Sequence, residues 1–68
     1  EDKYMMYRFN AYNKDGGLIY ALDTTDLGVA GIHYRGAEVN PDIAKVDLNV
    51  NYNDGKGWQQ LRSRIVRN

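Results

Sequence analysis

Residues 44–52, with the sequence AKVDLNVNY, decide the fold. Polar and apolar side chains alternate there through four successive pairs, Lys45-Val46, Asp47-Leu48, Asn49-Val50 and Asn51-Tyr52. A period of two puts one set of side chains on a core face and the other set in water. We therefore predict a β-strand over residues 44–52, with its apolar face packed inside the molecule.

Downstream, residues 53–57 (NDGKG) combine asparagine, aspartate and glycine, which is typical of a tight hairpin turn.

Residues 58–68 then fit two patterns. As a helix, their large apolar residues would share one stripe, whereas the β-branched pair Ile65-Val66 suits a pleated strand. The hairpin turn before the segment favours a strand, so we predict a strand over residues 58–68.

Upstream, residues 4–12 and 18–23 also alternate, and residues 13–17 (NKDGG) between them indicate a hairpin turn. Asp-Gly and Gly-Gly accept the positive φ angles that such turns need. One face of the first segment is apolar and consists of Met5, Tyr7, Phe9 and Ala11. The other face also carries large side chains, namely Tyr4, Met6 and Tyr12.

Residues 29–35 complete the set as a strand in the middle of the chain. Gly31 inside this segment suggests a bulge or a close backbone approach. The connection over residues 36–43 contains Pro41, and a single helical turn fits after Asn40 because proline suits a first helical position. Short connections between alternating segments favour neighbouring antiparallel strands.

These elements predict an all-β class. We expect a small antiparallel sheet of about five strands, curled into a barrel or half-sandwich, as a single domain over residues 1–68. The composition agrees, because six tyrosines favour pleated strands while seven glycines and seven asparagines favour turns.

Composition also excludes several classes of function. Cysteine is absent and histidine occurs once, which excludes disulfides, thiolate metal sites and a zinc site built from several histidines. Nine basic residues balance nine acidic ones, so the net charge does not favour nucleic acid or an anionic membrane. No apolar stretch approaches the length of a membrane span. We expect no cofactor, and we favour a secreted or cell-surface location slightly.

Catalytic chemistry is poorly represented, and we predict that the chain is not an enzyme. Ser63 is the only serine and lies among arginines, with no histidine near it in sequence. Alternation would place His33 and Arg35 on one strand face, where with Glu38 they could supply the acid, charge stabiliser and base of a small ribonuclease-like toxin. A solvated strand face and a loop glutamate explain the same residues more simply.

The carboxylates also indicate structure rather than chemistry. Residues 15–18 (DGGL) are a turn and not a phosphate-binding loop. No turn has the acidic spacing of a calcium loop, and turn or capping roles explain the aspartates in this group, Asp15, Asp23, Asp26 and Asp54. We therefore predict neither a catalytic residue nor a metal ligand.

Large aromatic side chains are the strongest functional signal. A core of this size supplies only about 3–5 kcal/mol of net stability, and the chain carries more aromatic surface than such a core can hide. Tyrosine and tryptophan are enriched at interfaces because they offer large, stiff, amphipathic contact areas. We therefore predict a non-catalytic binding or assembly module, either a homo-oligomer or a domain that docks on a larger protein partner. The candidate binding residues are Tyr4, Met6, Tyr12, Tyr34, Trp58, Arg62 and Arg64.

Two other classes of ligand stay open. Trp58 and neighbouring tyrosines could stack on sugar rings, which would make the chain a carbohydrate-binding module. Arg62, Arg64 and Arg67 could line the groove of a small barrel that binds single-stranded nucleic acid. The balanced net charge makes a nucleic-acid partner the less expected of the two.

Overall fold

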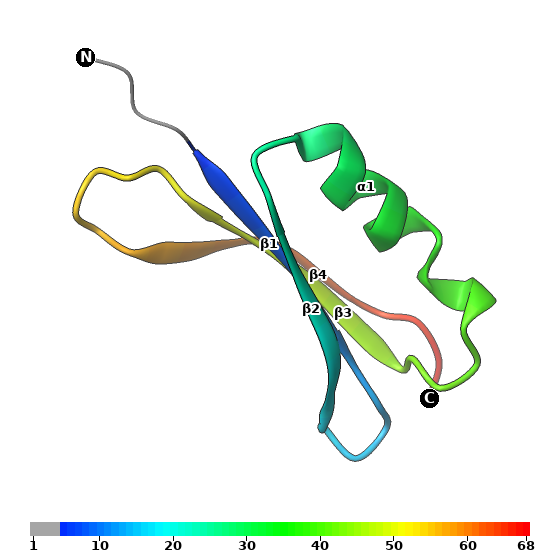
Figure 1. The fold of residues 1–68 in the computed structure, drawn as a ribbon. Coiled ribbons are helices and arrows are strands. Elements are labelled where there is room, and N and C mark those ends of the chain that lie inside the picture. Colours follow the sequence, from blue (N-terminus) through cyan, green and yellow to red (C-terminus); the bar gives the residue numbers. More distant parts are fainter. Residues whose placement is uncertain (1–4) are drawn as a thin grey trace.

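The computed structural model describes residues 5–68, in which four strands form one antiparallel sheet with a helix on one side (Figure 1). Along the chain the elements are β1 (Met6–Tyr12), β2 (Leu18–Thr24), α1 (Leu27–Arg35), the short helical turn η1 (Ala37–Val39), β3 (Lys45–Asn51) and β4 (Trp58–Ile65). The mostly β, antiparallel class is confirmed. The strand order is β2-β1-β3-β4, which leaves β2 and β4 as the two edges, and closure into a barrel is not seen.

The predicted strand over residues 29–35 is wrong, because this segment belongs to helix α1. Asp26 caps the helix: its Oδ1 accepts a hydrogen bond of 2.8 Å from the backbone N–H of Gly28. The helix packs on β1, β2 and β3 and buries Ala30 completely. Gly31 is therefore a helical residue and not a strand bulge. No helix within residues 5–68 is long and apolar enough to cross a membrane.

The core lies between α1 and the sheet. It takes alternate residues from the two central strands, namely Tyr7, Phe9 and Ala11 on β1 and Val46, Leu48 and Val50 on β3. The alternation predicted that these residues form the apolar faces of the two strands, and their burial confirms the prediction for both strands. Met5 and Tyr52 had been assigned to the same faces, but they lie just outside the strands and are exposed.

Both predicted hairpin turns are confirmed. In the first turn, Asn13 Oδ1 accepts hydrogen bonds from the backbone N–H groups of Asp15 (2.9 Å) and Gly17 (2.8 Å). In the second turn, three residues have positive φ angles, namely Asn53 (61°), Gly55 (87°) and Gly57 (78°). Glycine and asparagine reach this left-handed region most easily, which explains the composition of the turn.

The connection between α1 and β3 contains one helical turn, η1, which precedes Asn40 rather than following it as predicted. Asn40 instead makes a side-chain turn, in which its Oδ1 accepts a hydrogen bond of 2.9 Å from the backbone N–H of Asp42. Ala37 and Ile43 in this connection are buried, so the connection closes one end of the core.

The last segment is a strand, as predicted, and β4 pairs with β3. An irregularity of register leaves Leu61 without a partner on β3. Beyond it, Arg62 and Arg64 lie on the helix side of the sheet, whereas Gln60, which the alternation grouped with them, lies on the other side. Nearly all residues of β4 are exposed, since α1 packs on the other three strands.

Candidate binding surface

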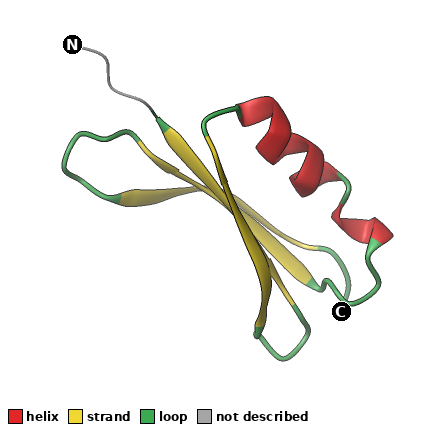
Figure 2. Ribbon diagram, viewed as in Figure 1, coloured by secondary structure: helices red, strands yellow, loops and turns green. Residues whose placement is uncertain are grey.

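One face of the sheet lies opposite the helical layer and is not covered by α1 or η1 (Figure 2). Residues paired across antiparallel strands share a face, so the register defines this surface, which we call the open face. It consists of Met6, Arg8, Asn10 and Tyr12 on β1, Leu18, Ala21 and Asp23 on β2, Lys45, Asp47, Asn49 and Asn51 on β3, and Trp58, Gln60, Ser63 and Ile65 on β4.

Trp58 and Arg8 form a stacked pair that reaches across β3. The Arg8 guanidinium lies 4.3 Å from the centre of the Trp58 ring. Asp23 holds the same guanidinium through two hydrogen bonds, from Arg8 Nε at 2.7 Å and from Nη2 at 2.9 Å. These bonds lower the pKa of Asp23 and raise that of Arg8. Trp58 stays 39% exposed, so the stack presents an indole to solvent in a fixed orientation.

Asp47 is buried at the middle of the open face, with 7% exposure, although the alternation placed it in water. Its Oδ1 accepts hydrogen bonds from Asn10 Nδ2 at 2.9 Å and from Asn49 Nδ2 at 2.8 Å. Burial and the negative charge of Asp47 raise the pKa of Tyr12 nearby. The centre of the open face is therefore a hydrogen-bonded polar patch whose buried carboxylate has its partners.

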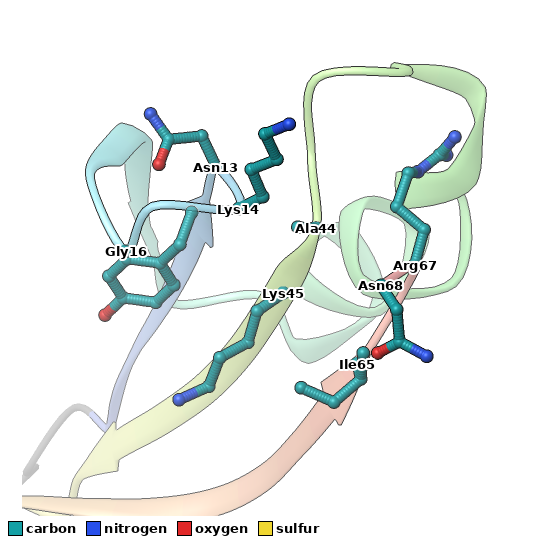
Figure 3. Close-up of a pocket in the computed structure, with 9 residues that line it drawn as sticks. Asn13, Lys14, Gly16, Ala44, Lys45, Ile65, Arg67 and Asn68 are labelled. Atoms are coloured by element: carbon teal, nitrogen blue, oxygen red, sulfur yellow. The ribbon is translucent and has the colours of Figure 1, made fainter.

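At the end of the open face farther from Trp58, a cavity of about 470 Å³ opens beside Tyr12 (Figure 3). Lys14, Lys45 and Arg67 line it, and the Lys45 ammonium lies 5.8 Å from the centre of the Tyr12 ring. The side chains of Lys14 and Lys45 point away from each other (Figure 3). Arg67 is already bonded to backbone carbonyls. The three cations therefore do not converge on one ligand group.

The charged side chains of the open face cancel. Arg8 and Lys45 contribute positive charge, and Asp23 and Asp47 contribute negative charge. An electrically balanced face offers no long-range attraction for a phosphate backbone.

No protein-family model, curated protein or solved structure matches this chain. The predicted site residues are divided between the two faces of the sheet. Those on the open face are Met6, Tyr12 and Trp58. Those on the helix side are Tyr34, Arg62 and Arg64, and Tyr4 lies outside the described residues.

Arg64 and Tyr34 form an internal clamp. The Arg64 guanidinium lies 5.3 Å from the centre of the Tyr34 ring, and its Nη2 donates to the Tyr34 carbonyl at 2.7 Å and to Glu38 Oε1 at 3.0 Å. Because Tyr34 is in the last turn of α1, this cation satisfies the helix end. Arg62 has no ion pair within residues 5–68. Of the two predicted arginines, Arg62 is therefore the one free to meet a ligand.

The residues considered for catalysis are engaged with other partners. His33 is a half-buried residue of α1, and its Nδ1 is hydrogen-bonded to the Tyr20 hydroxyl on β2 at 2.9 Å. Glu38 pairs with the Arg64 guanidinium. Ser63 lies on the open face, so the sheet separates it from His33. Within residues 5–68, no cluster of histidine, aspartate and glutamate side chains could hold a metal ion.

Arg8 and Asp47 were not among the predicted site residues, and Asp23 was given a turn or capping role, whereas it lies in β2 and pairs with Arg8. Arg8 and Asp23 lie directly opposite each other in the β1–β2 hairpin. Counting outward from the predicted turn would have placed Arg8 opposite Leu22, because the irregularity between Ala11 and Tyr12 shifts the register by one residue. The contact between Arg8 and Trp58 depends on the pairing of β1 with β3, for which no local pattern gives a signal.

Two carboxylates are expected to make the stability of the domain fall in acid. Hydrogen bonds from Arg8 lower the pKa of Asp23, and the backbone N–H of Glu38 together with Arg64 lowers the pKa of Glu38. A carboxylate with a lowered native pKa contributes stability above its unfolded pKa, and this contribution is lost as the pH falls through the native pKa. We expect the melting temperature to fall as the pH drops below about 4, the ordinary carboxylate range.

Thermal melts followed by circular dichroism over a pH series check this expectation. Asp23→Asn and Glu38→Gln should each flatten the acid side of the stability profile. Asp15→Asn is the control, because Asp15 is an exposed turn residue with no ion pair within residues 5–68. If the melting temperature falls equally steeply with decreasing pH in all three variants, the assignment of this pH dependence to Asp23 and Glu38 is contradicted.

Proposed function

We propose that this chain is a non-catalytic binding module that holds a polypeptide against the open face of its sheet, with Trp58 as the anchor. The observation that carries the proposal is the Asp23–Arg8–Trp58 stack, in which an exposed indole is braced in one orientation. Tryptophan and arginine are the residue types that most often dominate binding energy at protein interfaces. A braced side chain also has less conformational entropy to lose on binding.

The surroundings of Trp58 support an interface as well. Met6 and Trp58 both lie opposite Asn51, so the same face carries an apolar side chain two strands away from the anchor. Asn49 and Gln60 add amide donors and acceptors on the same face. An apolar and aromatic centre with a polar rim is the usual composition of transient protein interfaces.

Panning a phage-displayed library of random peptides on the folded chain tests this proposal. We expect the enriched peptides to bind Trp58→Ala about 30-fold more weakly or worse, as measured by calorimetry, because removal of a central tryptophan commonly costs 2 kcal/mol or more. Trp58→Phe should retain part of the affinity.

Tyr52→Ala is the matched control, since Tyr52 is 40% exposed but lies in the turn after β3. No enrichment on the native chain, or an equal loss in Tyr52→Ala, would count against the proposal. The same test includes sedimentation of the chain without peptide, which measures whether the chain forms a dimer. A dimer that Trp58→Ala dissociates would identify the bound polypeptide as a second copy.

A carbohydrate is the second candidate ligand, and the electrical balance of the open face favours it. The uncovered part of the Trp58 ring could stack on a sugar ring, and Asn49, Asn51 and Gln60 could bond its hydroxyl groups. Because the chain has one tryptophan, its fluorescence reports on this site alone. A panel of oligosaccharides that leaves the emission unchanged would remove this candidate.

The proposal does not extend to single-stranded nucleic acid. Arg64 is held in the clamp at the end of α1, and the charges of the open face cancel. A binder of this kind needs a positively charged groove along its aromatic side chains. That arrangement is not present among the described residues of the open face.

A further inference from the structure

A hollow lies on the helix side of the sheet, between α1 and strands β3 and β4. Its volume is about 510 Å³. Two of its wall positions on the helix are glycines, and the end of the Arg35 side chain lies beside one of them, Gly31. We call this hollow the slot, and it is lined by Leu27, Gly28, Gly31, Tyr34 and Arg35 on α1, Leu48 on β3 and Arg62 on β4.

The rim of the slot is cationic. Arg35 and Arg62 both line it, and neither has an ion pair within residues 5–68. Among residues 5–68, no carboxylate lines the slot, and residues 55–68 contain four cations and no acidic residue. An apolar hollow with free guanidinium groups at its rim matches an apolar side chain that has carboxylates beside it.

The strand next to the slot is an edge of the sheet. The outer side of β4 has no partner strand within residues 5–68, so part of its backbone is free to pair with an extended chain. The side chains of β4 are exposed on both faces. A strand added beside β4 would alternate its side chains, with one set toward the slot and the other toward the open face.

We propose that the β4 edge and the slot receive an extended acidic peptide segment as a fifth strand, with one apolar side chain in the slot and carboxylates on Arg35 and Arg62. This inference rests on the proposed function, because the ligand is again a polypeptide. It adds that the bound polypeptide is extended and acidic. The side chains on the other face of the added strand reach the edge of the open face, where β4 carries Trp58.

A second copy of this chain fits the β4 edge poorly. Two β4 strands paired around a two-fold axis would bring Arg62 and Arg64 of both copies onto the same side of the joint sheet. The β4 strand has no carboxylate to offset that repulsion. An acidic segment removes the conflict, and the complementarity of charge therefore selects a separate acidic partner.

An NMR titration of the isotope-labelled chain tests the inference. The probe is the blocked synthetic peptide Thr-Glu-Thr-Leu-Thr-Glu-Thr, whose leucine and glutamates project to one side when the peptide is extended. We expect amide shifts concentrated in β4 and around the slot, and intermolecular backbone contacts of a strand pair along β4. The same peptide with lysine in place of glutamate should not bind.

Gly31→Ala separates slot binding from loss of folding. A Cβ at Gly31 meets only the flexible end of the Arg35 side chain, with Nη1 at 3.0 Å. Alanine is the better helix former, so this variant should fold at least as well while its methyl group narrows the slot. We expect the probe to bind it about tenfold more weakly, which is typical of one carbon atom in an apolar pocket.

Two further variants complete the test. Ile32→Ala, at a helix position that is 63% exposed and outside the slot, should bind the probe like the native chain. Arg62→Glu should transfer the preference from the glutamate peptide to the lysine peptide. Unchanged binding to Gly31→Ala, or equal binding of the two peptides to the native chain, would overturn the slot proposal. Neither result would affect the role of Trp58, which the library peptides test separately.

Discussion

Phe9→Ala is expected to leave the domain largely unfolded at room temperature. The Phe9 side chain is fully buried, and its ring centre lies 5.5 Å from that of Tyr20 and 5.7 Å from that of His33. Truncation of a buried phenylalanine costs about 3–5 kcal/mol. A core of this size supplies a similar net stability, about 3–5 kcal/mol. Loss of the cooperative thermal transition in circular dichroism would report the effect.

Phe9→Leu is the conservative counterpart and keeps most of the buried volume. We expect it to fold with a lowered melting temperature. Tyr52→Ala, which removes an exposed aromatic ring, should melt close to the native chain. A cooperative transition of Phe9→Ala within a few degrees of the native value would contradict the central place of Phe9 in the core.

Arg64→Ala is expected to produce the second large loss of stability, about 2 kcal/mol, because hydrogen bonds to charged groups typically contribute about 1.5–3 kcal/mol. The variant loses the donor to the Tyr34 carbonyl and the partner of Glu38. It also loses the cation at the end of α1. Urea denaturation should show a lowered midpoint with an unchanged slope.

Arg62→Ala is the matched control for the clamp. It removes the same type of side chain from the same side of β4, but Arg62 has no ion pair within residues 5–68. We expect its free energy of unfolding to change by less than about 0.5 kcal/mol. Equal losses in the two variants would show that the clamp does not stabilise the helix end.

Alternation predicted β1, β2 and β3, whereas the hairpin turn before β4 and its β-branched end decided that strand, and the turn residues predicted the two hairpins. Val46, Leu48 and Val50 are buried, as their spacing predicted, and Phe9 on β1 is buried for the same reason. The turns could be predicted because glycine and asparagine reach conformations that other residues avoid. These signals are local, and each can be found without knowing which strands are neighbours.

The helix could not be predicted in the same way. Leu27–Arg35 is short, and Gly28 and Gly31 weaken its helix propensity. Much of its support comes from distant residues, since Arg64 satisfies its end and β1 provides the surface on which Ala30 packs. Tertiary contacts outweighed the alternating pattern that had suggested a strand.

The candidate site was predictable only in part. Met6, Tyr12 and Trp58 were selected for their size, and the register brings all three to the open face. The brace of Trp58 was not predicted, because Arg8 reaches it only when β1 lies beside β3. The slot was missed because it exists only between a helix and a strand that the sequence did not show to be neighbours.

The strand order has a consequence for synthesis on the ribosome. The central pair joins β1 to β3, so the β3 part of the core, Val46, Leu48 and Val50, lies in a segment that is translated after the first hairpin and α1. Until that segment emerges, Phe9 can contact Tyr20 and His33 but not the β3 side chains of the same core, and a nascent chain with exposed apolar surface is prone to aggregation. We therefore expect the first half of the polypeptide to complete its core only when the second half has been made.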